Sequence, residues 1–268
     1  MKLGIISDIH LDTNEDYPVM DVLSDKLHEE NCNGLILAGD ISDTAVNTFK
    51  MLDDIRKKLG MPLWFVPGNH DMWDPDHKFN DTWEIYNEYR QMNDCLCGKA
   101  VEVGDLGILT GSLGWYDYSF ADNEKFTLED FQRKNNYGRT WQDSRFVRWN
   151  KDDITVCNEM LDEMKAPIAE NQGKRITAVT HMLGIPEFSV VPPVDIWDYF
   201  NAFLGSSVYG DYYEKNGVDC AIMGHVHHRQ RIVKNGVDYR CACLGYHTEW
   251  TTKDTVKEVT ESLQYLEK

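Results

Sequence analysis

The sequence has too few cysteines for a disulfide scaffold and contains no long apolar run. Its seven cysteines are an odd number in a chain of 268 residues, and they are too sparse for a disulfide scaffold. No run approaches the roughly 18 apolar residues of a membrane-spanning helix. Asp8 interrupts the first apolar run too early for a signal peptide. We therefore expect a cytoplasmic protein with reduced thiols and no membrane partner.

Positive charge is also scarce. The chain has 27 Lys and Arg residues against 45 Asp and Glu residues, which gives a formal net charge of −18. Because nucleic-acid binding depends largely on neutralising phosphates, this balance argues against a nucleic-acid partner. It is compatible with a small phosphorylated substrate, since a bound metal ion can supply positive charge locally.

Apolar side chains make up 42% of the sequence and aromatic ones 12%, which is enough to build a core. The chain has no linker rich in Pro, Gly or Ser and no internal repeat, so we expect one domain over residues 1–268. Apolar runs alternate with segments of helical spacing in the first seventy residues, which predicts a parallel sheet covered by helices on both faces. The apolar runs are residues 3–7, 34–38 and 62–66, and the helical segments are residues 17–30 and 45–59.

The second half of the chain also contains strand patterns. Turns at Gly104-Asp105 and Asn235-Gly236 indicate two hairpins. The runs over 175–180 and 219–223 predict two further strands. The segment 115–166 between them is aromatic and strand-poor and ends in a helical pattern, so we interpret it as a helical insertion. The whole is an α/β chain with two sheets and helices outside them.

Polar side chains follow the predicted strands at the point where each strand ends. In open α/β sheets, ligands bind just beyond these carboxyl ends, so the side chains are expected to meet at one rim. Residues two apart in an extended chain project to the same side and can share one metal ion. Imidazole nitrogens with carboxylate or amide oxygens suit Mn, Fe or Zn, and seven donors are enough for two divalent ions. The seven candidate ligands are Asp8, His10, Asp40, Asn69, His181, His225 and His227.

With these blocks in this order, the sequence resembles the calcineurin-like metallophosphoesterase superfamily. The blocks are Asp8-Ile-His10, Gly39-Asp40, Gly68-Asn-His-Asp71, His181 and Gly224-His-Val-His227. The resemblance extends from residue 3 to about residue 230 and implies a four-layer α/β/β/α sandwich. It implies one metal held by Asp8, His10 and His227, and a second held by Asn69, His181 and His225. It further implies that Asp40 bridges the two metals.

The resemblance also implies a reaction. A hydroxide that bridges the two metals attacks a small phosphomonoester or phosphodiester, so no Ser or Cys nucleophile is required. His70 contacts the phosphate and protonates the leaving oxygen, and Asp71 orients the ring of His70. The alternatives are a nuclease of the same fold, against which the negative charge counts, and a scaffold that has lost catalysis. A scaffold should lack His70 or several ligands, and this sequence retains all of them.

Two further groups of residues have open interpretations. Arg145 and Trp149, within the insertion, are candidates for substrate binding if this segment is a lid, with Arg pairing to phosphate. The alternative is a solvated cap with a partly buried aromatic seam. The Cys-x-Cys pairs at 95–97 and 241–243 lack the usual spacing of zinc ligands, and we interpret them as buried core cysteines.

Overall fold

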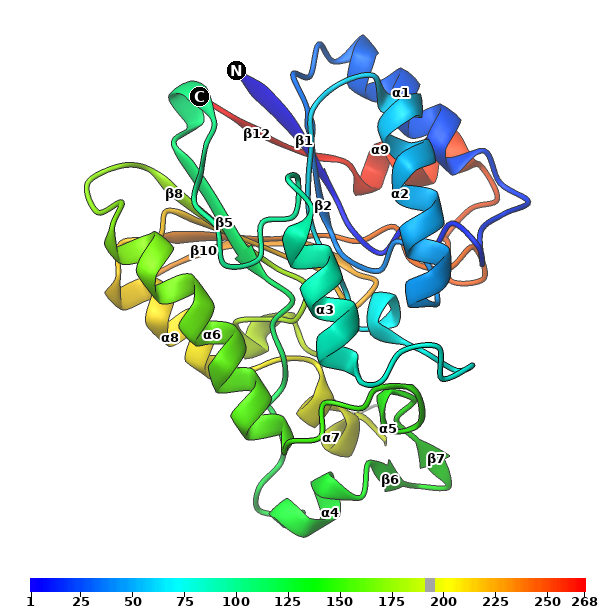
Figure 1. Ribbon diagram of the computed structural model, residues 1–268, viewed down its shortest axis with the longest axis vertical. Helices are drawn as coiled ribbons and strands as arrows, with labels where there is room; N and C mark the ends of the chain where they lie inside the picture. Colours follow the sequence, from blue (N-terminus) through cyan, green and yellow to red (C-terminus); the bar gives the residue numbers. More distant parts are fainter. Residues whose placement is uncertain (191–195) are drawn as a thin grey trace.

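Two β-sheets lie between two outer layers of helices in the computed structural model, which describes residues 1–190 and 196–268 (Figure 1). The first sheet has the strand order β12-β1-β2-β3. Strands β1, β2 and β3 run parallel, as their alternation with helical segments predicts, and β12 is antiparallel to β1. The four strands are β1 (Lys2–Ile6), β2 (Leu35–Ala38), β3 (Leu63–Val66) and β12 (Gln264–Glu267).

The second sheet has the order β10-β11-β9-β8-β5-β4. Its four inner strands run parallel to one another, and its two edge strands pair antiparallel with them in the predicted hairpins β4–β5 and β10–β11. The strands are β4 (Val101–Glu102), β5 (Ile108–Ser112), β8 (Ile176–Thr180), β9 (Cys220–Met223), β10 (Arg229–Lys234) and β11 (Val237–Ala242). The expected mixed fold with two sheets is therefore confirmed.

Helices cover the outer face of each sheet, which completes the four layers (Figure 1). The first sheet is covered by α1 (Val19–Glu29), α2 (Ala45–Leu59) and α9 (Thr255–Ser262), and α3 (Thr82–Gln91) lies beside α2. The second is covered by α6 (Asp153–Ala169) and α8 (Ser207–Lys215). No helix in the described part of the chain is long and apolar enough to cross a membrane.

Helix α2 shows why these segments fold as the sequence predicts. Thr44 caps its first turn by accepting a hydrogen bond from the backbone N–H of Asn47, and Gly60 ends it in the left-handed conformation at φ 60°. The side chains of Leu52 and Ile55 lie on one face of the helix and are buried in the core. Each such burial stabilises the fold by about 1.5–3 kcal/mol.

The two sheets meet where β1 and β11 end. The backbone N–H of Ser7 donates to the carbonyl of Ala242, and the N–H of Leu244 donates to the carbonyl of Ser7. The next contact along the chain joins Gly245 N–H to the carbonyl of Asp8. The carboxyl ends of strands from both sheets are thereby brought to one shared rim.

The segment 115–166 is divided between two locations. Its last part is α6, which packs directly on the second sheet and so belongs to an outer layer. The preceding part projects at one end of the molecule beside α7 (Trp197–Phe200) (Figure 1). This projecting part contains α4 (Leu128–Gln132), the small hairpin β6 (Asn135–Asn136) and β7 (Arg139–Thr140), and α5 (Asp143–Phe146).

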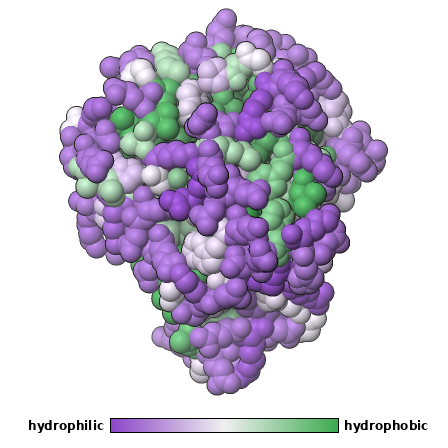
Figure 2. Space-filling view, viewed as in Figure 1, coloured by the Kyte–Doolittle hydropathy of each residue, from purple (hydrophilic) through white to green (hydrophobic). Residues whose placement is uncertain are grey.

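The surface agrees with the charge balance of the sequence. The face seen in Figure 2 is mostly hydrophilic, with apolar residues confined to small patches. The cysteines are all free, and all but Cys32 are buried. Cys241 and Cys243 lie with their Sγ atoms 3.4 Å apart, as expected for core residues at alternate positions of one strand face.

Thiol reactivity tests this packing. In the native protein, a thiol reagent such as dithionitrobenzoate is expected to titrate only Cys32 rapidly, because the other six thiols are buried. In denaturant all seven should react. Cys32→Ser is the control and should leave no rapidly reacting thiol. Rapid native titration of several thiols in that variant would contradict the burial described.

Candidate metal centre

The seven predicted ligands lie together at the rim where the strands of both sheets end. Donor atoms of Asp8, His10, Asp40 and His227 lie within 4.8 Å of one another. Donor atoms of Asp40, His181 and His225 form a second group and also lie within 4.8 Å of one another. Asp40 belongs to both groups, so the geometry offers two adjacent cation sites that share one carboxylate.

The atoms inside each group face one another. The Nε2 atoms of His10 and His227 are 3.2 Å apart, and Nδ1 of His225 is 3.2 Å from Nε2 of His181. The amide oxygen of Asn69 lies 3.0 Å from the same nitrogen of His181, so Asn69 joins the second group. Converging imidazole nitrogens and oxygens form a donor set that fits divalent metal ions such as Zn, Mn or Fe.

Three of the four ligand imidazoles have a hydrogen-bond acceptor at Nδ1, on the side away from the centre. The Nδ1 atom of His10 lies 2.9 Å from a carboxylate oxygen of Asp43, and that of His227 lies 2.6 Å from Glu249. The Nδ1 atom of His181 lies 2.9 Å from the carbonyl oxygen of Ala38. An acceptor at Nδ1 places the proton there and leaves the Nε2 lone pair facing the centre, as metal-binding histidines require.

The backbone at the rim is unusual. Five of the seven candidate ligands adopt a left-handed conformation, which costs a residue other than glycine on the order of 1–3 kcal/mol. Hydrogen bonds between strand ends hold it, for example from the N–H of His10 to the carbonyl of Asp40 (3.1 Å). The five φ angles are 54° for Asp8, 37° for His10, 52° for Asp40, 76° for His225 and 53° for His227. Such local strain is typical of functional sites.

Charge is concentrated at Asp40. Burial acts to raise the pKa of Asp40, but His181, His70 and His10 outweigh burial and hold it well below its usual range. Burial acts to lower the pKa of His181, yet Asp40 raises it to about 10. Burial and the charge of His181 lower the pKa of His225 to about 3. Without metal, protons on imidazoles therefore balance the central carboxylate, and metal binding must displace them.

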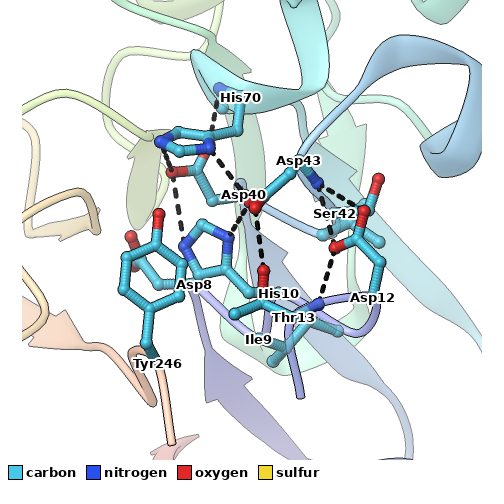
Figure 3. A network of polar contacts seen from close by, with 12 residues as sticks. Asp8, Ile9, His10, Asp12, Thr13, Asp40, Ser42, Asp43, His70 and Tyr246 are labelled. Atoms are coloured by element: carbon cyan, nitrogen blue, oxygen red, sulfur yellow. Dashed lines mark hydrogen bonds and ion pairs between the residues drawn. The ribbon is translucent and has the colours of Figure 1, made fainter. Parts of the chain in front are cut away.

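His70 lies at the edge of the centre, with its Nε2 atom 4.0 Å from Asp40 (Figure 3). Its ring stacks on Trp73 at 3.7 Å between centroids, and its Nδ1 atom is 3.0 Å from Asp43. Burial acts to lower the pKa of His70, but Asp40 and Asp43 outweigh it and raise the pKa to about 9. In the metal-free protein the ring is therefore protonated at neutral pH, the state that a proton donor requires.

The expectation that Asp71 orients this ring is wrong. The carboxylate of Asp71 is buried and accepts hydrogen bonds from Gly68 N–H (2.7 Å), Thr48 Oγ1 (2.6 Å) and backbone amides of the loop after β2. The 3-10 turn at His70–Met72 directs the two side chains apart. Asp43 contacts the ring instead (Figure 3). In the sequence, a carboxylate three residues after Asp40 could have indicated this role.

A cavity of about 670 Å³ opens over the centre. The candidate ligands Asp40, Asn69, His225 and His227, together with His70, line one side. The other side is largely aromatic and apolar, and among the described residues Arg139 is the one Lys or Arg in the lining. The aromatic residues of the wall are Trp73, Trp141, Trp197, Phe200 and Tyr246.

Neither predicted substrate-binding residue lies in this cavity. Trp149 is buried among aromatic rings, 4.6 Å from Trp83 and 5.4 Å from Trp115 between centroids, so the alternative of an aromatic seam holds for it. Arg145 is exposed on α5 outside the lining. The cavity instead receives Arg139 and Trp141 from the same insertion, because β7 folds back over the centre.

Two residues that the sequence analysis did not single out also belong to the site. Glu249 holds His227, and the ring of Tyr246 packs against His10 at 4.4 Å and His227 at 4.7 Å between centroids. Both follow β11 on the loop at its carboxyl end. The rule that polar residues after strands gather at one rim would have found them.

Comparison with known proteins places this geometry in a family. A curated relative from Mycobacterium tuberculosis, named acyl-carrier-protein phosphodiesterase PptH, is 23% identical over 279 residues, which cover 92% of this chain and 79% of the relative. The crystal structure titled phosphopantetheinyl hydrolase PptH, from the same organism, superposes with a TM-score of 0.75 at 18% identity, over 93% of this chain and 91% of that one.

A dimetal phosphatase from Danio rerio superposes with a TM-score of 0.51 at 18% identity, over 90% of this chain and 86% of the other. At these identities the superpositions show a common fold. The sequence model of the calcineurin-like phosphoesterases matches residues 1–229, which include all seven candidate ligands and His70. The chain belongs to the calcineurin-like phosphoesterase family and is a metal-dependent phosphoric ester hydrolase.

Proposed function

We propose that this phosphoesterase uses two divalent metal ions to hydrolyse a phosphodiester that carries an extended, largely uncharged arm. The observation that carries the proposal is the cavity over the centre, in which four of the seven candidate ligands and His70 face an aromatic wall. The metal donors would bind the ions that act on the phosphate, and the aromatic wall would contact the uncharged arm.

Two sets of three donors would hold the metals, and Asp40, which belongs to both groups, would bridge them. One set is Asp8, His10 and His227, and the other is Asn69, His181 and His225. Two such ions, Mn, Fe or Zn, supply Lewis acidity that activates water and stabilises charge on the phosphoryl oxygens. They also supply the positive charge that a chain of net charge −18 lacks.

His70 would protonate the leaving oxygen. Its ring is fixed by stacking on Trp73 and by the contact of Nδ1 with Asp43, so Nε2 is the nitrogen free to face substrate. Before metal binds, Asp40 and Asp43 raise the pKa of His70 to about 9, against the effect of burial, and Asp43 stays beside the ring whether or not Asp40 holds metal. An alkoxide leaving group needs such a proton.

The proposed substrate is a phosphopantetheinyl group on a carrier protein, and the proposed bond is its phosphodiester to that protein. Two observations support it: similarity to PptH over 92% of this chain, and an apolar wall suited to an extended arm. A nuclease is less consistent with a cavity that, within the described residues, has one arginine in its lining. Buried free thiols favour the reducing cytoplasm as the place of action.

The first test is hydrolysis with added Mn²⁺. Bis-nitrophenyl phosphate and a phosphopantetheinyl carrier protein should both be cleaved, and a chelator should abolish turnover. Asp40→Asn should lose both metals and activity, because Asp40 is common to the two donor groups. Elemental analysis that finds two tightly bound metals in Asp40→Asn would contradict the bridging role, and cleavage of monoesters alone would contradict the diester substrate.

The second test separates proton donation from metal binding. His70→Ala should retain both metals and lose on the order of 10²–10⁴ in rate with alkyl esters. The loss should be much smaller with nitrophenyl esters, because nitrophenolate departs without a proton. Equal losses with both leaving groups would mean that His70 only positions the phosphate.

The third test concerns the insertion. Arg139→Ala should raise KM for the diester about 10- to 100-fold, since Arg139 lines the cavity and a hydrogen bond to a charged group contributes about 1.5–3 kcal/mol. Metal content should not change. Arg145→Ala is the matched control on the same segment, because Arg145 lies outside the cavity. An equal rise of KM in both variants would indicate a general effect of surface charge.

A further inference from the structure

One buried carboxylate of the insertion reaches the metal centre. Asp143 begins α5, and its side chain is 1% exposed. It accepts three hydrogen bonds, from Asn69 Nδ2 (2.9 Å), Trp73 Nε1 (2.8 Å) and Trp141 Nε1 (2.8 Å). Among the described residues, no Lys or Arg lies within 4.0 Å of it, and its charge helps to raise the pKa of His70. The three N–H donors and this neighbouring ring offset the cost of burying the carboxylate.

The bond to Asn69 determines which end of the amide faces the centre. An asparagine amide presents an oxygen on one side and an NH2 group on the other, and the two orientations are nearly equal in shape. An ionised carboxylate only accepts hydrogen bonds, so the NH2 group must point at Asp143. The oxygen then points the other way, where it lies 3.0 Å from Nε2 of His181.

The bonds to the two indoles tie Asp143 to the rest of the site. Trp73 is the ring on which His70 stacks, at 3.7 Å between centroids. Trp141 lines the cavity and meets the ring of His225 edge-on at 5.8 Å. One carboxylate therefore contacts a candidate ligand, the ring on which the proposed proton donor stacks, and a residue of the cavity wall.

We propose that Asp143 is a positioning residue, which turns the amide oxygen of Asn69 toward the metal and fastens the insertion to the centre. The inference rests on the metal centre of the proposed function. It assigns to residues 115–166 a part in metal affinity as well as in covering the cavity. An Asn at 143 would offer one carbonyl oxygen to three N–H donors, so at least one of them would lose its partner.

The test is calorimetric titration of the metal-free protein with Mn²⁺, which needs no substrate. Asp143→Asn should weaken Mn²⁺ binding by about 10- to 100-fold, as loss of a partner behind a metal ligand does. Asp153→Asn is the matched control. Asp153 is 9% exposed and accepts from Trp115 Nε1 at 2.7 Å, but it contacts no candidate ligand. Its substitution should leave Mn²⁺ affinity unchanged.

A double-mutant cycle shows whether the effect passes through Asn69. In the Asn69→Ala background, Asp143→Asn should cause little further loss of affinity, because the amide to be oriented is gone. An equal loss in both backgrounds, or wild-type affinity in Asp143→Asn, would overturn the inference. A wild-type protein that binds no Mn²⁺ would overturn the metal centre itself, and the inference with it.

A measurement on the unmodified protein covers the case in which Asp143→Asn does not fold. The side-chain NH2 protons of Asn69 should exchange slowly with solvent in an NMR experiment, since Asn69 is 2% exposed and hydrogen-bonded to a buried carboxylate. Exchange at the rate of exposed asparagines would overturn the inference.

Discussion

The negative charge of Asp40, buried at the junction of the two sheets, must be compensated by its surroundings. Its side chain is 1% exposed, and an isolated carboxylate in such a place would be far too costly to keep ionised. The N–H of His70 donates to it at 3.0 Å, and His181 lies at 3.3 Å. The imidazoles around Asp40 can carry protons, or they can lose these protons and bind metal ions. The same arrangement thus stabilises the metal-free fold and prepares the site for metal.

This constraint explains why the strand ends are shaped as they are. A parallel strand delivers its next residues to the rim, but the chain must turn sharply to aim them at one point. The left-handed conformations of Asp8, Asp40 and His225 make these turns, and the packed sheets hold them. Gly68 allows the close approach, because a Cβ atom there would lie 2.1 Å from a carboxylate oxygen of Asp40. Fold and site are therefore specified by the same few residues.

Much of the fold was predictable, because the spacing of apolar residues that marks each helix or strand lies within a single segment. Helix α2 begins and ends at the predicted residues, since its cap and its apolar face lie within one segment. Strand β12 and helix α9 were missed. The four residues Gln264–Glu267 form a strand only because β1 offers an edge to pair with, and a short polar run does not carry that information.

The candidate ligands were predictable because each follows a strand, and the errors arose where long-range packing decides. Asp71 is adjacent to His70 in sequence, but its carboxylate accepts hydrogen bonds from Thr48 Oγ1 and the N–H groups of Gly68 and Ile41, and none from His70. Trp149 and Trp141 lie eight residues apart in the same aromatic segment, yet Trp149 lies in the aromatic seam and Trp141 lines the cavity. Only the path of the β6–β7 hairpin distinguishes them.

The insertion connects the cavity wall to the candidate metal centre through shared hydrogen bonds. Trp141 is part of the cavity wall, and its indole is held by the same carboxylate that holds Asn69. Hydrogen bonds thus join Trp141 to Asp143 and Asp143 to Asn69, so the cavity wall and a candidate ligand share one carboxylate. In the proposed function, an arm that displaced Trp141 would act on Asn69 through these contacts. In a chain with so few basic residues, the proposed function assigns attraction of the phosphate to the metals and selection of the arm to the aromatic wall.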